Sequence, residues 1–256
     1  MIELQRDRLR VSVFPDRASM GMAAADYVAE RLRRLLAGEV GRRARVLFAA
    51  AASQAEFLDA LGRAEGIDWA RVDAFQMDEY VGLARDDERS FGEWLDRRIF
   101  SIVQPGRVER LDPTTTDPAA ECRRYGALLA DGGLDLALVG IGENGHVAFN
   151  DPHVADFEDP EVVKPVEIDE TSRAQQVRDG AFVALALVPR LAMTVTMSTI
   201  LASGAISVVV PGPLKAPAVA RTLDGPIETA CPASALRHHP DVVMFTDEAA
   251  VSSVAH

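Results

Sequence analysis

Residues 134–139, LDLALV, form an apolar run with one polar interruption, at Asp135. Such a run is typical of a strand that helices cover on both faces, as in a parallel sheet, because neither face meets water. Runs of this kind alternate with helical patterns through almost the whole chain. The alternation predicts an α/β fold with a doubly wound, mostly parallel sheet and helices on both faces.

The expected elements follow from the spacing of apolar residues and from helix-capping residues. Strands are expected at residues 9–14, 45–50, 72–77, 134–139, 162–168, 193–197, 206–210 and 242–245. Helices are expected at residues 19–36, from 53 onward, and at 90–103, 118–130, 216–222 and 232–238. The 256 residues contain no internal repeat, low-complexity tract or linker rich in Gly, Ser or Pro, which favours a single α/β domain spanning residues 1–256.

The net charge of −12 restricts the ligands that this chain can bind. Nucleic acid is disfavoured as a partner, because its binding depends on Lys and Arg displacing condensed counterions. An anionic small molecule needs a local cationic site to overcome the overall field. The N-terminal residues lack the apolar core of a signal peptide, no apolar run is long enough to span a membrane, and Cys122 and Cys231 have no disulfide or zinc spacing. We therefore expect a soluble, cytoplasmic protein that does not bind membranes.

The turn after residues 134–139 contains the pattern G-x-G-x-x-G at Gly140, Gly142 and Gly145. A dinucleotide fingerprint needs a helix that opens at the third glycine, since the helix N-terminus holds the pyrophosphate. The following HVAFNDPHVADFEDP has two prolines and no helical period, although Glu167 and Asp169 lie where a ribose-binding acid is expected. We favour a tight turn that displays polar side chains, and we predict no nucleotide cofactor.

His146 in this turn is a candidate proton carrier, because histidine is the residue type whose ordinary pKa lies near neutrality. Glu143, Asn144 and Asp151 are close enough in sequence to orient an imidazole. The alternative is a structural histidine bonded to a backbone carbonyl. The density of polar neighbours favours the catalytic interpretation.

The segment FQMDEYVGL, residues 75–83, follows another expected strand and places Asp78 and Glu79 side by side next to Tyr80. A solvated turn is one interpretation. A general base is the other, since burial and like-charge repulsion raise the pKa of one carboxylate of such a pair. The spacing alone leaves both open.

FQMDEYVGL and GIGENGHVAFNDP together resemble the glucosamine-6-phosphate deaminase family, which shares its fold with the 6-phosphogluconolactonases. The resemblance extends over residues 46–247 and implies a Rossmann-like fold of the sugar-phosphate isomerase type. It also implies that Asp78 carries a proton between C2 and C1 of an open-chain sugar. His146 would open the sugar ring by moving a proton to the ring oxygen.

Two neighbours orient or tune the histidine in this family. Here these positions hold Asn144, where some members have aspartate, and Asp151, where many have glutamate. Asn144 cannot carry a negative charge, so any relay to the histidine depends on Asp151 or Glu143.

Family members hold the substrate phosphate with a turn rich in Thr-Gly and Thr-Pro after an early strand, together with an arginine and a lysine. Arg178 and Lys215 fall at matching places, although either could be an ordinary surface charge. The early turn here reads AAAASQ, residues 49–54, and lacks glycine. Ser53 and Gln54, at the start of a helix, could still donate hydrogen bonds to an anion.

The implied reaction is aldose–ketose isomerisation with deamination, from glucosamine 6-phosphate to fructose 6-phosphate and ammonium. Glu79 and the glycines Gly142 and Gly145 are candidate substrate contacts, the glycines because backbone amides of their turn could stabilise negative charge. Hydrogen moves within the substrate, so the reaction implies no redox cofactor. A small sugar phosphate is thus the expected partner.

Two other functions stay open from the residues alone. A 6-phosphogluconolactonase-type hydrolase would share the fold, but the lactonase pattern lacks the MDEY loop and has a different sequence after its GH pair. A non-catalytic regulator that binds a sugar phosphate is suggested by the altered AAAASQ turn and by Asn144. The five histidines form no metal-binding motif, so we expect no metal. The residues do not decide whether the chain forms a homo-oligomer.

Overall fold

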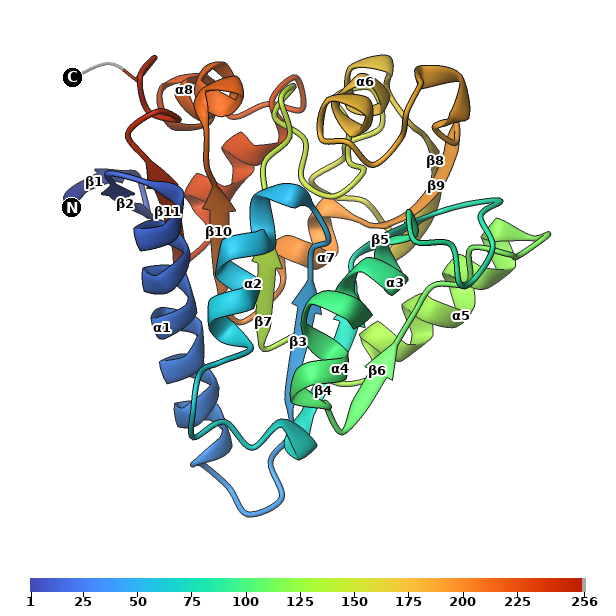
Figure 1. Cartoon of the computed structure of the whole chain (residues 1–256), viewed down its shortest axis with the longest axis horizontal. Coiled ribbons are helices and arrows are strands. Elements are labelled where there is room, and N and C mark those ends of the chain that lie inside the picture. Colours follow the sequence, from blue (N-terminus) through green and yellow to red (C-terminus); the bar gives the residue numbers. More distant parts are fainter. Residues whose placement is uncertain (255–256) are drawn as a thin grey trace.

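The structure, a computed structural model, describes residues 1–254. Its main sheet has eight strands in the order β1, β2, β11, β10, β7, β3, β4 and β6 (Figure 1). These strands are β1 Ile2–Arg6, β2 Leu9–Phe14, β3 Ala44–Phe48, β4 Val72–Gln76, β6 Arg107–Glu109, β7 Leu136–Val139, β10 Ile206–Val210 and β11 Val242–Asp247. Every neighbouring pair is parallel except β1 with β2, which confirms the predicted doubly wound, mostly parallel α/β fold.

Helices cover both faces of the main sheet. One face carries α1 Arg17–Leu36, α2 Ala55–Leu61, α3 Phe91–Leu95, the π turn Asp96–Phe100 and α4 Ser101–Val103. The other face carries α5 Pro118–Ala130, α7 Met197–Leu201, α8 Ala216–Asp224 and the 3₁₀ helix Pro232–His238. Helix α6, Glu170–Arg178, lies beyond the carboxyl ends of the strands (Figure 1). No helix within residues 1–254 is both long and apolar enough to cross a bilayer.

Strand β7 shows why the core has two halves. Leu136 and Leu138 pack into the cluster beneath α1 and α2, whereas Ala137 and Val139 pack into the cluster beneath α5 and α8. All four side chains are buried. The apolar run of residues 134–139 therefore contains a strand covered on both faces, and each face of the sheet buries its own hydrophobic cluster.

Three further strands form a second, antiparallel sheet in the order β5, β9, β8. They are β5 Asp78–Tyr80, β8 Val163–Glu167 and β9 Leu191–Val195. The sequence pattern does not separate β8 and β9 from the main sheet, because apolar spacing identifies a strand but not its partner. Neither β5 nor α6 is expected from the sequence, since β5 is only three residues long and α6 lacks an apolar stripe. Strands β1 and β6 and helix α7 are unexpected as well.

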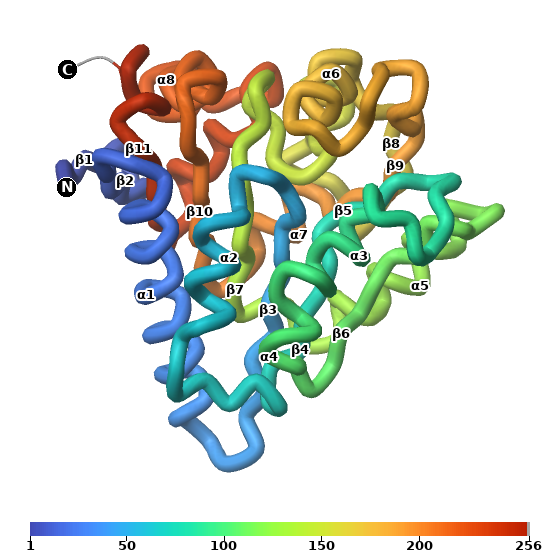
Figure 2. Tube along the Cα trace, in the orientation of Figure 1, coloured from blue at the N-terminus to red at the C-terminus, as the bar shows by residue number. Residues whose placement is uncertain are grey.

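The order of the strands reverses at β3. From β3 the chain adds β4 and β6 on one side, then returns to add β7, β10 and β11 on the other. In open α/β sheets a ligand binds at such a reversal, outside the carboxyl ends of the strands. Figure 2 shows the segments that follow β3, β7 and β10 reaching the same end of the molecule, where α6 also lies. The loops with polar candidates thus meet where a ligand is expected.

Candidate functional site

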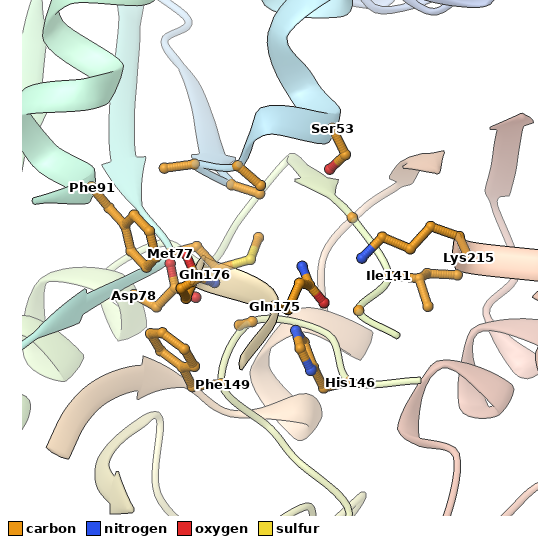
Figure 3. A pocket seen from close by; sticks show the side chains of 16 residues that line it. Ser53, Met77, Asp78, Phe91, Ile141, His146, Phe149, Gln175, Gln176 and Lys215 are labelled. Carbon is orange, nitrogen blue, oxygen red and sulfur yellow. The ribbon is translucent and has the colours of Figure 1, made fainter. Parts of the chain in front are cut away.

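A pocket lies at this end of the main sheet, between the strand ends and α6. Each surrounding segment contributes a polar side chain: Ser53 after β3, Asp78 from β5, His146 after β7, Lys215 after β10, and Gln175 from α6. Figure 3 shows Asp78 and Lys215 at opposite sides of the pocket, with His146 between them. Segments that are distant in sequence therefore meet at one site.

The Asp78 carboxyl group is buried but accepts no hydrogen bond from any of residues 1–254, and its side chain is only 7% exposed. Burial raises the pKa of Asp78 well above its ordinary value, and the negative charge of Glu79 raises it further. The backbone is fixed by the pairing of β5 with β9, in which Asp78 lies opposite Thr194. A carboxyl group in this state holds a proton more firmly than an exposed aspartate, which suits a general base near neutral pH.

Glu79 is buried beside Asp78, but its carboxylate is fully bonded. Oε1 accepts hydrogen bonds from the backbone N–H groups of Tyr80 at 2.9 Å and Phe91 at 3.1 Å. Oε2 accepts from the N–H of Gly92 at 2.9 Å and from Nε2 of Gln76 at 2.7 Å. Since Phe91 and Gly92 begin α3, Glu79 satisfies amides that the first turn of a helix leaves free. Glu79 lies outside the pocket lining, so the expected substrate contact is replaced by a structural one.

His146 is held through its Nδ1 atom. Nδ1 lies 2.8 Å from Oδ1 of Asn144, 2.9 Å from Oγ of Ser172 and 3.1 Å from Oδ1 of Asp151. Asn144 is fixed in turn, because Oδ1 also accepts from the His146 N–H at 3.0 Å and Nδ2 donates to Asp151 at 2.9 Å. Nε2 of His146 has no partner within residues 1–254. The structure therefore brings the expected neighbours Asn144 and Asp151 to the imidazole.

Asp151 is the charged partner of His146 and is completely buried, at 0% exposure. Burial alone would raise its pKa. Hydrogen bonding and charge from His146, with hydrogen bonds from Asn144 and Ser172, outweigh burial and lower the pKa of Asp151 to about 2. Its second oxygen, Oδ2, accepts from the N–H of Asp169 at 2.9 Å. Asp151 is thus ionised at neutral pH and favours an imidazole whose hydrogen is on Nδ1.

Glu143, the other expected partner of His146, points elsewhere. Its carboxylate forms an ion pair with Arg178 of α6, in which Nε lies 3.2 Å from Oε1 and NH2 also contacts Oε2. The expected relay through Glu143 is therefore absent. Arg178 is part-exposed and lies outside the pocket lining, so the expected cationic pair of Arg178 and Lys215 does not share the pocket surface.

Lys215 is the cation that lines the pocket, and it is only 7% exposed. It follows Gly212, whose φ of +95° favours glycine and whose N–H donates to the Asp247 carboxylate at 2.9 Å. Burial lowers the pKa of Lys215, although the charges of Asp179 and Glu143 oppose that effect. The ammonium group has no hydrogen-bond partner among residues 1–254. A buried, unpaired charge is unfavourable, and an anionic ligand would relieve it.

Of the two polar residues in the turn after β3, Ser53 lines the pocket and Gln54 does not. Gln54 is buried, and its Nε2 donates to the carbonyl oxygen of Val209 at 2.9 Å and to Oγ of Ser53 at 3.3 Å. Gly140 makes room for this amide, because a Cβ at Gly140 would lie 3.0 Å from Nε2. Gln54 therefore joins the turn to β10, and only Ser53 of the pair is placed to meet a ligand.

The glycines Gly142 and Gly145 shape the turn around His146. The Gly142 N–H donates to the His146 carbonyl at 2.9 Å, and the Gly145 N–H donates to the Gly142 carbonyl at 3.0 Å, so neither amide is free for a ligand. A Cβ at Gly142 would lie 2.0 Å from Cε1 of the His146 ring. Gly145 has a φ of +91°, and a Cβ there would lie 2.7 Å from Sγ of Cys231. Both positions require glycine for steric reasons, and the amides of Gly142 and Gly145 themselves are not available to stabilise charge on a ligand.

Several residues of the site are not predicted from the sequence. Gln175 and Gln176 of α6 line the pocket, and Ser172 of the same helix contacts His146. Phe91 and Phe149, whose ring centroids lie 5.7 Å apart, also line the pocket and form an apolar wall there. Residues that meet only through tertiary packing have no fixed spacing, and the mostly polar sequence of α6 gives no helical period.

Comparison with known proteins finds relatives along nearly the whole chain. The sequence model of the family described as glucosamine-6-phosphate isomerases/6-phosphogluconolactonase matches residues 15–244. A glucosamine-6-phosphate deaminase of Arthrobacter sp. (strain FB24) is 34% identical over 254 residues, which cover 96% of this chain and 93% of the relative. A protein of the same name from Bacillus velezensis is 38% identical over 191 residues, covering 73% of this chain and 77% of the relative.

Solved structures of similar proteins share the fold. A structure described as a monomeric glucosamine-6-phosphate deaminase is 30% identical with a TM-score of 0.87, over 95% of this chain and 99% of that chain. A 6-phosphogluconolactonase from Trypanosoma brucei is 18% identical with a TM-score of 0.76, over 96% of this chain and 98% of that chain. The second likeness establishes a common fold only.

Asp78 and Asp151 are expected to affect stability in opposite directions. The pKa of Asp78 is raised in the folded protein, so stability falls as the pH rises above the ordinary value of 3.8, where the unfolded chain ionises first. Asp78→Asn should therefore raise the free energy of unfolding at pH 7, by on the order of 1 kcal/mol. The lowered pKa of Asp151 contributes stability above 3.8 that is lost toward pH 2, so Asp151→Asn should lower the free energy of unfolding at pH 7 by about 2 kcal/mol.

Urea unfolding of both variants and of the unmodified chain at pH 3 and pH 7 measures these differences. The gain for Asp78→Asn should disappear at pH 3, and the loss for Asp151→Asn should shrink there. The chemical change is the same in both variants, so each serves as the control for the other. Two losses of similar size at pH 7 would contradict an unpaired carboxyl group at Asp78.

Proposed function

This chain belongs to the family of glucosamine-6-phosphate isomerases and 6-phosphogluconolactonases, and we propose that it converts glucosamine 6-phosphate into fructose 6-phosphate and ammonium. The observation that carries the proposal is the single pocket that Asp78, His146 and Lys215 line together. It holds the Asp78 carboxyl group, Nε2 of the His146 imidazole and the Lys215 ammonium group. None of these three groups forms a hydrogen bond or an ion pair within residues 1–254. The reaction requires a base, a ring-opening proton carrier and a phosphate anchor, and these groups match that requirement.

The substrate phosphate would bind at the Lys215 side of the pocket. Its negative charge would compensate the buried ammonium group, which has no protein partner among residues 1–254. Ser53, on the same side of the view in Figure 3, adds a hydroxyl donor. Arg178 would join the phosphate by exchanging its ion pair with Glu143.

His146 would open the pyranose ring. With the imidazole hydrogen on Nδ1, the lone pair of Nε2 is free to accept a proton. Nε2 takes the proton of the C1 hydroxyl group while the C1–O5 bond breaks, and the imidazolium then gives the proton to O5. The products are the C1 aldehyde and the C5 hydroxyl group, and the imidazole returns to its starting state. Asp151, 3.1 Å from Nδ1, stabilises the transient positive charge.

Asp78 would then move hydrogen from C2 to C1. Its carboxylate removes the C2 proton, and the electrons of that bond form the C1–C2 double bond. O1 takes a proton from the C2 ammonium group of the substrate and becomes a hydroxyl group, which leaves a lone pair on the nitrogen. The carboxyl group returns the proton to C1, and the nitrogen lone pair forms a C2 iminium. Water adds to C2 and the C–N bond breaks, which releases ammonium. A base with a raised pKa is well matched to a carbon acid near neutral pH.

A lactonase is the alternative within the family. Hydrolysis of a lactone needs one group to activate water, which His146 could do alone. Asp78 would then be a buried, unpaired carboxyl group with no chemical task, at a cost to stability. The unpaired state of Asp78 therefore favours isomerisation with deamination.

We also propose the cytoplasm as the location of the protein. Cys122 and Cys231 are both buried and free rather than joined in a disulfide. Free cysteines suit a reducing compartment.

The proposed reaction predicts ammonium release from glucosamine 6-phosphate. Asp78→Asn should lower kcat by about a thousandfold, because the amide cannot accept the C2 proton. Asp86→Asn, at an exposed acid outside the site, is the matched control and should leave kcat unchanged. A coupled ammonium assay gives the rates. Hydrolysis of 6-phosphogluconolactone without ammonium release would favour the lactonase, and binding of glucosamine 6-phosphate without turnover would favour a regulator.

Lys215 and Arg178 are expected to differ in their effect on the phosphate group. Lys215→Met should raise KM for glucosamine 6-phosphate by about 10- to 100-fold, since it removes a charged partner from the pocket. Arg178→Met should have a smaller effect, because Arg178 is paired with Glu143 and part-exposed. Steady-state kinetics of both variants with glucosamine, which lacks the phosphate, should show no difference from the unmodified chain. A larger effect of Arg178→Met would contradict the assignment.

A further inference from the structure

Ser172 contacts the imidazole of His146 from a different part of the fold. It belongs to α6, whereas His146 and Asp151 belong to the turn that follows β7. The Ser172 side chain is only 1% exposed, and its Oγ lies 2.9 Å from Nδ1 of His146. The same Oγ donates a hydrogen bond to Oδ1 of Asp151. One hydroxyl group therefore joins the imidazole to the carboxylate.

The chemistry of these groups fixes the direction of each hydrogen bond. The Asp151 carboxylate can only accept, so the single hydrogen of the Ser172 hydroxyl is used on Asp151. The Ser172 oxygen is then left as an acceptor, and it shares the hydrogen on Nδ1 of His146 with Oδ1 of Asn144. Ser172 thus accepts from His146 and donates to Asp151 at the same time.

The contact of Ser172 with His146 matters more in this chain because residue 144 is Asn and not Asp. The Asn144 side chain is neutral, and its Oδ1 accepts from both the backbone N–H and Nδ1 of His146. Its Nδ2 donates to Asp151 at 2.9 Å. Asp151 is therefore the negative charge beside the ring, and it reaches the ring directly at 3.1 Å and through neutral Asn144 and Ser172.

We propose that Ser172 is a positioning residue, which holds the hydrogen of the neutral His146 imidazole on Nδ1 and so leaves Nε2 free to take a proton in the pocket. The inference rests on the proposed function, because it assigns Ser172 to the ring-opening step. It also links that step to α6, since Gln175 and Gln176 of the same helix line the pocket. Displacement of α6 removes one of the acceptors that orient the imidazole.

The test compares Ser172→Thr with Ser172→Val, which have nearly the same shape and differ in the hydroxyl group. Ser172→Val should lower kcat by about 10- to 100-fold, the effect of losing a hydrogen bond within a charged group, with KM changed by no more than about twofold. Ser172→Thr should recover most of that loss. Ser172→Ala also removes the hydroxyl group but adds no atoms to this buried position. It should lower kcat as Ser172→Val does, and it separates the loss of the hydroxyl group from any effect of the larger side chains on packing.

Nitrogen-15 NMR of the His146 ring reports the position of its hydrogen independently of turnover. The unmodified chain and Ser172→Thr should show hydrogen on Nδ1, and Ser172→Val and Ser172→Ala should show an increased share of the form with hydrogen on Nε2. Equal kcat values for Ser172→Ala and the unmodified chain, or a ring signal that Ser172→Ala does not change, would overturn the proposal. If the unmodified chain released no ammonium, the proposed function would fail, while the ring signals would still decide whether Ser172 positions His146.

Discussion

Strand β9 holds Asp78 and His146, the two groups proposed to transfer protons, in register. Thr194 of β9 lies opposite Asp78 of β5, and its Oγ1 accepts from the Phe149 N–H at 3.1 Å, three residues after His146. The side chain of Asn150 adds a hydrogen bond to the Val195 carbonyl at 2.9 Å. One strand therefore fixes the Asp78 segment on one side and the His146 turn on the other. The distance between Asp78 and His146 depends on this shared support.

The peptide of Met77 fixes the second sheet to the main sheet. Its N–H donates to the Phe48 carbonyl at the end of β3, at 3.1 Å, and its carbonyl accepts from the Val195 N–H of β9, at 3.0 Å. Asp78, the next residue, is thereby placed at the carboxyl ends of the parallel strands, where open α/β sheets bind ligands. The same two hydrogen bonds therefore fix Asp78 in the fold and place it at the pocket.

The buried charges divide into those that the protein satisfies and those that it leaves for a ligand. Glu79 accepts four hydrogen bonds and anchors α3, and Asp151 is bonded through both oxygens. Asp78 and Lys215 line the pocket and have no such partners among residues 1–254. Unsatisfied buried groups lower stability, and their presence together at one pocket is typical of a functional site. Hydrogen bonding therefore distinguishes Asp78 and Lys215, which are left to meet a ligand, from Glu79 and Asp151, which the protein itself satisfies.

The sequence predicts those parts of the fold and site that depend on local pattern. The two-sided burial of β7 is evident from its continuous apolar run, and the motifs locate Asp78, His146 and Asp151. Which group each polar side chain contacts depends on tertiary packing, and no local sequence pattern predicts it. Gln54 and Ser53 are adjacent, yet Gln54 bonds to Val209 and only Ser53 reaches the pocket.

Helices and strands that lack a regular spacing of apolar residues are not predicted from the sequence. Helix α6 is mostly polar, so neither the helix nor the contact of Ser172 with His146 is predicted. Glu79 stands beside Asp78 in the sequence, but its use in capping α3 depends on a helix that begins at Phe91. Adjacent acids thus acquire different functions from contacts made far along the chain.

A structure of the chain with a hexose 6-phosphate bound would test whether Asp78 and His146 act on one sugar. We expect the phosphate at Lys215, a carboxylate oxygen of Asp78 about 3 to 3.5 Å from both C1 and C2, and Nε2 of His146 within about 3 Å of O5. A sugar held in the pocket with C1 and C2 turned away from Asp78, or bound outside the pocket, would contradict it.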